Sequence, residues 1–302
     1  MLERIIIIVV VSLASLFAEA GECTIDGIVF NYSYKIEGSG ESYHIDANVI
    51  VTDGKSKTGV VDIPAYITVD DGLRLMVTVI GASAFEGNSE ITKVIIPGGV
   101  SHIYGSAFKG CTALEEVSIG TPSQGMPSDG LTYIDGHAFE NCMSLKRIDF
   151  PNSLQKIGDY AFNGCIDLST VIVSGSLVKI GDYAFQNCEA MKSIDLSEGV
   201  GEIGQYAFNN CYSMTSIKFP SEGFTTIGSS CFRHCTSLES ITIPGCVGSI
   251  GDYCCRGCTG LKNAVIELGK KSFLGDYLFD GSTNLTQATI SCYNTLHSDV
   301  FR

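Results

Sequence analysis

IGDYAF occupies Ile157–Phe162 and occurs again, letter for letter, at Ile180–Phe185. Close variants run through most of the chain, and they span Ile80–Phe85, Ile103–Phe108, Ile134–Phe139, Ile203–Phe208, Ile227–Phe232, Ile250–Cys255 and Leu274–Phe279. The last residues of successive copies are 23, 31, 23, 23, 23, 24, 23 and 24 positions apart. Self-similarity at such a period is the signature of a solenoid, in which each repeat packs only against its neighbours.

Each unit continues in a fixed way after its aromatic residue, as in Phe232, Cys235, Leu238, Ile241, Ile243 and Pro244. The Leu-x-x-Ile-x-Ile part ends with the period of two that indicates a half-buried strand. The part from the glycine to the cysteine has helix-like spacing. The positions where an N-cap would lie hold Asp159, Asp182, Asp252 and Asp276. We therefore expect an α/β repeat solenoid, a right-handed coil of about nine units with a parallel sheet on its concave face and short helical turns outside. Phe162, Phe185 and Phe208 should be stacked neighbours in its core.

The pattern I-G-x-x-A-F-x-x-C-x-x-L-x-x-I-x-[IL]-P resembles the BspA-like, or Treponema-type, leucine-rich-repeat family. The resemblance covers Val79 to about Phe301. Members of that family are typically secreted or surface proteins associated with adhesion to host proteins and to other cells. The resemblance therefore implies a leucine-rich-repeat fold and a binding function, whereas the repeat spacing alone indicates only a solenoid.

The first 20 residues have the features of a signal peptide. Arg4 precedes an apolar run, Ile5–Phe17, and the small-x-small site Ala18-Glu19-Ala20 follows it. An uncleaved anchor is the alternative, although the run is short for a bilayer span. No later stretch of the sequence is long and apolar enough to cross a membrane. The sequence therefore predicts a secreted or cell-surface protein with no membrane span after the signal is removed.

The remaining chain divides into a cap and a solenoid. Residues 21–76 lack the repeat and read as β-hairpins that cap the first unit, and residues 77–302 form the solenoid. The long step holds an insert, residues 120–131, which is either a tolerated surface loop or a binding loop. Leu296, Val300 and Phe301 begin a further unit, which is either a C-terminal cap or a truncated repeat.

Charge and strand alternation indicate the class of partner. The chain has 19 basic and 33 acidic residues and a formal net charge of −14, which disfavours nucleic acid and anionic membranes. Alternation places the second and fourth residues after each Leu position on the outer side of the sheet. The binding residues predicted from this stripe are Lys93, Glu116, Arg147, Asp149, Ser193, Asp195, Lys218 and Thr242. The mixed stripe suits an extracellular or cell-surface protein or glycan, although an ordinary solvated sheet face would look the same.

Cysteine is abundant and periodic. Seven of the 13 cysteines occupy one column of the repeat: Cys111, Cys142, Cys165, Cys188, Cys211, Cys235 and Cys258. Buried thiols explain the column best, because cysteine is small and packs well. Cross-rung disulfides stay possible in an oxidising compartment, and Cys23 is a candidate for an intermolecular bridge. A zinc site is disfavoured because four ligands must converge on one point.

No catalytic pattern stands out. The histidines His44, His102, His137, His234 and His297 fall at unrelated positions of different units, and the aspartates of IGDYAF recur as structural residues do. We therefore expect neither an enzyme nor a cofactor. The leading hypothesis is a secreted or surface protein that binds other proteins in adhesion or host interaction. The alternative is a self-assembling extracellular coat protein, and a hydrolase with an unfamiliar site is the remotest of the three.

Overall fold

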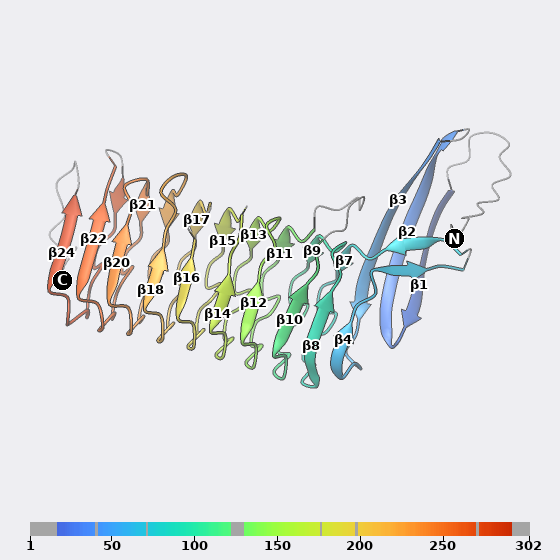
Figure 1. The fold of residues 1–302 in the computed structure, drawn as a ribbon, viewed down its shortest axis with the longest axis horizontal. Helices are drawn as coiled ribbons and strands as arrows, with labels where there is room; N and C mark the ends of the chain where they lie inside the picture. The colour runs from blue at the N-terminus through green and yellow to red at the C-terminus, as the bar shows by residue number, and fades with distance from the viewer. Residues whose placement is uncertain are drawn as a thin grey trace.

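The structure is a computed structural model that describes residues 17–39, 42–70, 72–121, 130–175, 177–196, 199–269 and 272–291. Most of the predicted signal peptide, the centre of the insert and the predicted C-terminal half-unit lie outside these residues. The described chain is a β-solenoid whose units succeed one another along the long axis of the molecule (Figure 1). Each unit contributes two strands, and about nine units stack in parallel.

The longer strand of each unit is the predicted Leu-x-x-Ile-x-Ile segment, and we call these the ladder strands. They are β8 (Ile91–Ile96), β10 (Glu116–Ile119), β12 (Arg147–Asp149), β14 (Thr170–Ile172), β16 (Ser193–Asp195), β18 (Ser216–Lys218), β20 (Ser240–Ile243), β22 (Asn263–Glu267) and β24 (Gln287–Ser291). Equivalent residues pair in parallel, for example Ile148 with Val171. Pairing forms three sheets, β14-β12-β10-β8-β4, β16-β18 and β20-β22-β24. The sheets follow one another, because β14 contacts β16 and β18 contacts β20.

A second sheet was not predicted. Two-residue strands precede the glycine of each unit: β7 (Val79–Ile80), β9 (His102–Ile103), β11 (Tyr133–Ile134), β13 (Lys156–Ile157), β15 (Lys179–Ile180), β17 (Glu202–Ile203), β19 (Thr226–Ile227), β21 (Ser249–Ile250) and β23 (Phe273–Leu274). They pair in parallel from β7 to β23 along one continuous sheet. The solenoid therefore has two strand-bearing sides, with the apolar columns between them.

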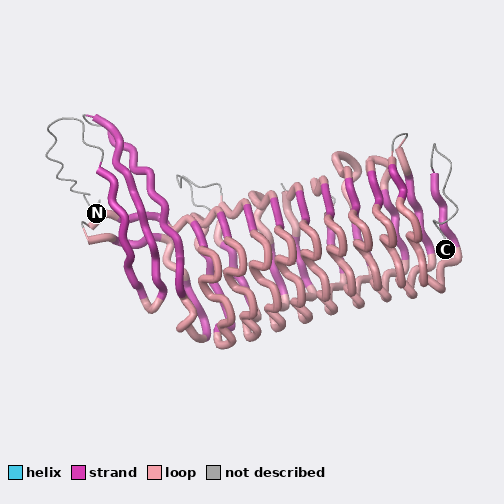
Figure 2. The backbone as a smooth tube through the Cα atoms, turned by 180° about the vertical axis from the view of Figure 1, so that it is seen from behind, coloured by secondary structure: helices cyan, strands magenta, loops and turns pink. Residues whose placement is uncertain are grey.

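The predicted helical turn is wrong, and so is the α/β label, because the described chain contains only strands and turns (Figure 2). Two residues of each turn segment adopt left-handed backbone angles; Tyr183 has φ 57° and Asn187 has φ 59°. An α-helix of L-residues cannot continue through such positions. Some backbone amides of a turn donate to the next unit and others donate within the turn. Phe162 N donates to Ala184 O of the next unit at 2.7 Å, and Cys165 N donates to Phe162 O of its own turn at 3.2 Å. Successive turns are therefore hydrogen-bonded to one another.

Three of the four predicted N-cap aspartates, Asp159, Asp182 and Asp252, act between units. Asp159 Oδ1 accepts a hydrogen bond from the backbone N of Asp182 at 2.9 Å. Asp182 Oδ1 accepts one from Gln205 N, and Asp252 Oδ1 accepts one from Asp276 N, each at 2.9 Å. Each carboxylate thus caps a backbone donor of the following unit and not a helix of its own.

The core is a stack of phenylalanine rings. The rings of Phe162 and Phe185 are 5.2 Å apart and those of Phe185 and Phe208 are 5.5 Å apart, which confirms the predicted stack. The stack also includes Phe85, Phe108, Phe139 and Phe232, and all seven side chains are fully buried. Each buried ring contributes roughly 1.5–3 kcal/mol through the apolar surface it removes from water. The repeat therefore folds because no single unit could bury this surface alone.

The N-terminal segment consists of antiparallel strands that join both sides of the solenoid. β1 (Phe17–Ile25), β2 (Ile28–Ser39) and β3 (Ser42–Asp53) pair in order and reach beyond the stack at its N-terminal end (Figures 1 and 2). β3 then pairs in parallel with β7, and β4 (Gly59–Asp62) pairs with β8. A further hairpin joins β5 (Tyr66–Thr68) and β6 (Arg74–Met76).

Candidate functional site

The outward side chains of the ladder strands form a surface that we call the ladder face. It contains all eight residues predicted for binding; Lys93 is half-buried and the other seven are exposed, namely Glu116, Arg147, Asp149, Ser193, Asp195, Lys218 and Thr242. Alternation explains their position, since Ile148 between Arg147 and Asp149 is fully buried. Register aligns them across units, with Glu116 beside both Lys93 and Arg147, and Asp195 beside Lys218.

Charges on the ladder face pair with one another. Lys93 Nζ lies 2.7 Å from Glu116 Oε1, and Lys218 Nζ lies 2.8 Å from Asp195 Oδ2. Arg147 binds both carboxylate oxygens of Asp149 two residues along the same strand, at 2.7 and 2.8 Å. A hydrogen bond from Lys93, with a second from Ser118, lowers the pKa of the Glu116 carboxyl. Exposed pairs of this kind add little to stability, so they leave the face polar, locally neutral and available to a partner.

Apart from Glu267 at the end of β22, the rest of the ladder face is uncharged or apolar. Thr242 lies beside Val265 of β22, which lies beside Thr289 of β24. Ile172 of β14 is 39% exposed although it belongs to a strand. The face therefore changes along its length, from paired charges between β8 and β18 to mainly hydroxyl, amide and apolar groups on β20–β24.

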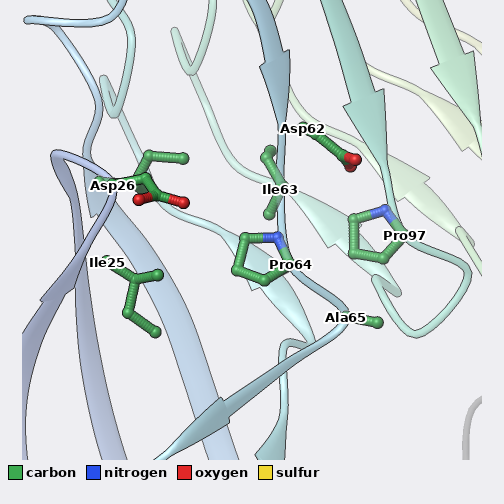
Figure 3. Close-up of a pocket in the computed structure, with 8 residues that line it drawn as sticks. Ile25, Asp26, Asp62, Ile63, Pro64, Ala65 and Pro97 are labelled. Atoms are coloured by element: carbon green, nitrogen blue, oxygen red, sulfur yellow. The ribbon is translucent and has the colours of Figure 1, made fainter.

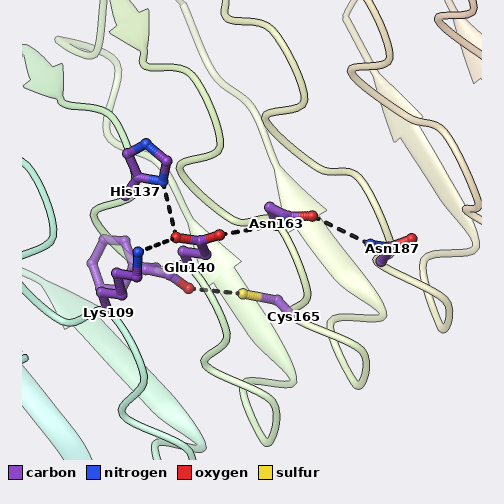
Figure 4. Close-up of polar contacts among 7 residues, drawn as sticks. Lys109, His137, Glu140, Asn163, Cys165 and Asn187 are labelled. Carbon is purple, nitrogen blue, oxygen red and sulfur yellow. Dashed lines mark hydrogen bonds and ion pairs between the residues drawn. The ribbon is translucent and has the colours of Figure 1, made fainter. Parts of the chain in front are cut away.

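A second polar cluster lies on the turn segments and was missed from the sequence (Figure 4). Glu140, whose side chain is only 13% exposed, accepts hydrogen bonds from Lys109 Nζ at 2.8 Å, His137 Nδ1 at 2.9 Å and Asn163 Nδ2 at 3.1 Å. Burial alone would raise the pKa of the Glu140 carboxyl, but the three hydrogen bonds outweigh burial and lower it. The donors come from three units. Lys109, Glu140 and Asn163 each directly follow the phenylalanine of their unit, so the repeat offered a signal for this column, and only His137 lies at another repeat position.

This cluster continues as a ladder of amides. Asn187 Nδ2 donates to Asn163 Oδ1 at 3.3 Å, and Asn210 Nδ2 donates to Asn187 Oδ1 at 2.8 Å. His234 Nδ1 lies 3.2 Å from Asn210 Oδ1 and ends the series. The ring of His137 also stacks on Tyr160, with 4.9 Å between the ring centroids. The contacts of this cluster join side chains of successive units, so their role is to hold the turns together.

The cysteine column lies inside the turns. All seven side chains are fully buried, and each thiol donates to the carbonyl oxygen of a phenylalanine in the preceding unit; Sγ–O distances range from 3.0 Å for Cys258 to 3.3 Å for Cys188. Burial raises the pKa of the Cys111 thiol to about 12. Because the thiolate is the reactive form, such thiols are inert. The twelve cysteines of the described chain, Cys23 included, are free.

Two further observations concern the described residues alone. No three side chains among their histidines, cysteines, aspartates and glutamates come together in a way that could hold a metal ion. No helix in the same part of the chain could cross a membrane.

Comparisons with known proteins agree with this architecture. The family model for the BspA type leucine-rich repeat region, with six copies, matches residues 73–188, 122–236 and 178–302. A leucine-rich repeat protein from Bacteroides ovatus is 25% identical over 89% of this chain and 71% of that chain, with a TM-score of 0.58. The leucine-rich repeat protein of T. pallidum is 31% identical over 63% of this chain and 83% of that chain, with a TM-score of 0.56. No curated protein matches the sequence. The repeat, the stacked parallel strands and the family match together show that the chain belongs to the BspA type leucine-rich-repeat family.

Proposed function

We propose that this chain acts outside the cell, secreted or held at the cell surface, and binds protein partners through the ladder face in adhesion or host interaction. The observation that carries the proposal is the ladder face itself, whose mainly polar outward side chains are aligned in register within each of the three sheets between β8 and β24. Extended surfaces of this kind are what solenoid proteins use to bind partners. The association of the resembled family with adhesion supports the same function.

Export rests on the predicted signal peptide. Phe17–Ala20 belong to β1 and pair with Ser33–Ile36 of β2. Cleavage after Ala20 would therefore shorten β1 to Gly21–Ile25 and leave the rest of the hairpin in place. Mass spectrometry of the exported protein tests this, because a mature N-terminus at Gly21 is the expected result. An intact Met1 on exported protein would contradict cleavage.

The capping role of the N-terminal hairpins belongs to this proposal. β3 and β4 pair with the first strand on each side of the solenoid, β7 and β8. An unpaired first strand would offer its edge to other chains. β3 and β4 would therefore cover the edges of the first solenoid strands, and β1 and β4 become the terminal strands of the two sheets at that end.

Affinity capture tests the binding function. The exported protein is immobilised and exposed to extracts of host matrix and cell surfaces, and bound proteins are identified by mass spectrometry. A second sample carries Arg147→Glu, Asp195→Lys and Lys218→Glu, which reverse ladder-face charges. A control with the same change in net charge carries Lys35→Glu, Lys156→Glu and Glu189→Lys, outside the ladder strands. We expect bound partners to be lost from the first variant only. Capture that is equal for wild type and both variants would contradict binding through the ladder face.

Self-assembly is the second candidate. Within the described residues β24 pairs on one side only, with β22, so its other edge is available to a second chain. Light scattering on the mature protein separates the candidates. A concentration-dependent rise in mass supports assembly, and a strict monomer at high concentration contradicts it.

A further inference from the structure

A cavity of about 410 Å³ lies where the N-terminal hairpins meet the first ladder strands (Figure 3). Three separate segments line it: the turn between β1 and β2, the chain at the end of β4, and Pro97 directly after β8. Neither the β1–β2 turn nor the chain at the end of β4 belongs to the repeat, so the stacking of units does not require a cavity here. Its volume falls in the range of about 300–1,000 Å³ that is typical of ligand pockets.

Six of the eight residues that line this cavity are aliphatic. Ile63 and Pro64 lie at its centre, with Ile25 on one side and Pro97 on the other (Figure 3). Ile63 is buried, whereas Pro64 and Pro97 are half-buried and leave carbon surface facing the opening. A ligand that enters the cavity therefore meets rigid proline rings and branched side chains, which suit an unbranched aliphatic chain.

Two carboxylates flank these walls. Asp26 belongs to the β1–β2 turn and Asp62 ends β4, and both side chains are exposed. Within the described chain neither carboxylate forms an ion pair; the nearby ammonium group of Lys57 donates to the backbone oxygen of Asp26 at 2.7 Å. With a net charge of −14, the whole chain adds to the negative potential at this point.

We propose that this cavity receives a lysine or arginine side chain of a protein partner. Such a side chain has an aliphatic stem for the proline and isoleucine walls and a cationic head for the carboxylates. Both carboxylates are exposed, so solvent screens their attraction for the cation, and the aliphatic walls hold the stem of the side chain. The proposed partner is thus a polypeptide with an exposed lysine or arginine residue.

The position of the cavity relates it to the ladder face. Asp62 pairs in register with Ile95 of β8, and Val60 on the same strand is 60% exposed. A basic side chain in the cavity would place the neighbouring residues of the partner on the first ladder strands. Buried anchor side chains surrounded by weaker polar contacts are common at protein interfaces. This inference rests on the proposed function only in taking the partner to be a protein.

Titration of the full mature chain with small probes tests the cavity directly. The probes are Nα-acetyl-lysine methylamide, Nα-acetyl-arginine methylamide and the uncharged Nα-acetyl-norleucine methylamide, followed by amide chemical shifts in NMR. We expect saturable shifts at Ile63 and Ala65 with the two basic probes and at least tenfold weaker binding of the norleucine probe. Equal affinity for all three probes, or no saturable shift at these amides, would overturn the proposal.

Variants separate the contributions of charge and shape. Asp26→Asn and Asp62→Asn should each lower the affinity of the basic probes several-fold. Asp70 is an exposed aspartate outside the lining, so Asp70→Asn should leave the affinity unchanged. Ala65→Phe should fill the cavity and abolish binding without changing the charge. Binding that survives both Ala65→Phe and the double asparagine variant contradicts the assignment. Arg147→Glu on the ladder face should leave probe binding to the cavity unchanged. A negative result for partner binding at the ladder face can therefore be told apart from a negative result for probe binding in the cavity.

Discussion

At the scale of single residues, each inner ring of the phenylalanine stack lies between two neighbouring rings. Phe185 is fully buried between Phe162 and Phe208. We expect Phe185→Ala to lower the free energy of unfolding by about 3–5 kcal/mol, because it removes buried surface and leaves a cavity. Phe273→Ala is the matched control, since Phe273 is 62% exposed and its loss should cost about 0.5 kcal/mol or less. Urea unfolding followed by circular dichroism measures both, and equal effects would contradict the stack.

Glu140 makes stability depend on pH. Its carboxyl has a lower pKa in the folded chain than in the unfolded chain, chiefly through Lys109, His137 and Asn163 acting against burial. The stabilisation is therefore complete above the unfolded pKa of about 4.3 and is lost as the pH falls through the folded pKa. We expect Glu140→Gln to cost about 1–3 kcal/mol at pH 7 and progressively less in acid.

The measurement is a series of urea unfolding curves from neutral to acidic pH. Glu115→Gln serves as the control, because Glu115 forms an exposed pair with Lys146 and its loss should matter little at any pH. A Glu140→Gln effect that stays constant with pH would show that shape and not charge holds this cluster together.

At the scale of elements, the left-handed positions define the turns. Gly110 and Gly164 are equivalent residues with φ 72° and 74°. A Cβ on Gly110 would meet only Gly87, at 3.6 Å, whereas one on Gly164 would collide with the side chain of Asn141. We expect Gly110→Ala to cost about 1–2 kcal/mol through its backbone alone. Gly164→Ala should cost more, and Gly164→Ala combined with Asn141→Gly should return towards the Gly110→Ala value. Thermal or urea unfolding of the three variants checks this order.

The same turns show where sequence reasoning succeeds and where it stops. The ladder strands and the phenylalanine stack follow from periodicity, because burial imposes a period of two on a strand and identical positions on every unit. The helical turn was wrong because spacing by three suits a chain of turns as well as a helix. Gly164, Asn187 and Asn210 before the cysteine column were the available signal, since glycine and asparagine favour left-handed backbone. No such signal marks Tyr183, whose left-handed backbone accompanies a hydrogen bond from Tyr183 N to Gln205 O of the next unit.

The candidate sites also differ in how far the repeat pattern predicts them. Ladder-face residues such as Arg147 could be predicted because their exposure follows from alternation. Periodicity also places Lys109, Glu140 and Asn163 in one column, directly after the phenylalanines, but it does not show that their side chains and His137 turn towards one carboxylate. The cavity at Asp26 and Asp62 depends on how the unrepeated hairpins lie against β4 and β8, and periodicity contains no information on that contact.

At the scale of the whole molecule, stacking makes the solenoid modular in units of 23 residues. Deletion of residues 181–203 joins Ile180 to Gly204 and recreates the repeat, so every column continues across the junction. We expect this shortened protein to fold, with β-rich circular dichroism and a lower free energy of unfolding, because nearest-neighbour contacts between units supply the stability. Deletion of residues 181–201 removes almost as much chain but shifts the register by two residues, which sets Ile180 beside Glu202 in sequence and misaligns the columns. That variant should aggregate or lose its cooperative unfolding transition. If both deletions behave alike, stability does not depend on register between units, and the columns of Phe and Cys would have to be explained in another way.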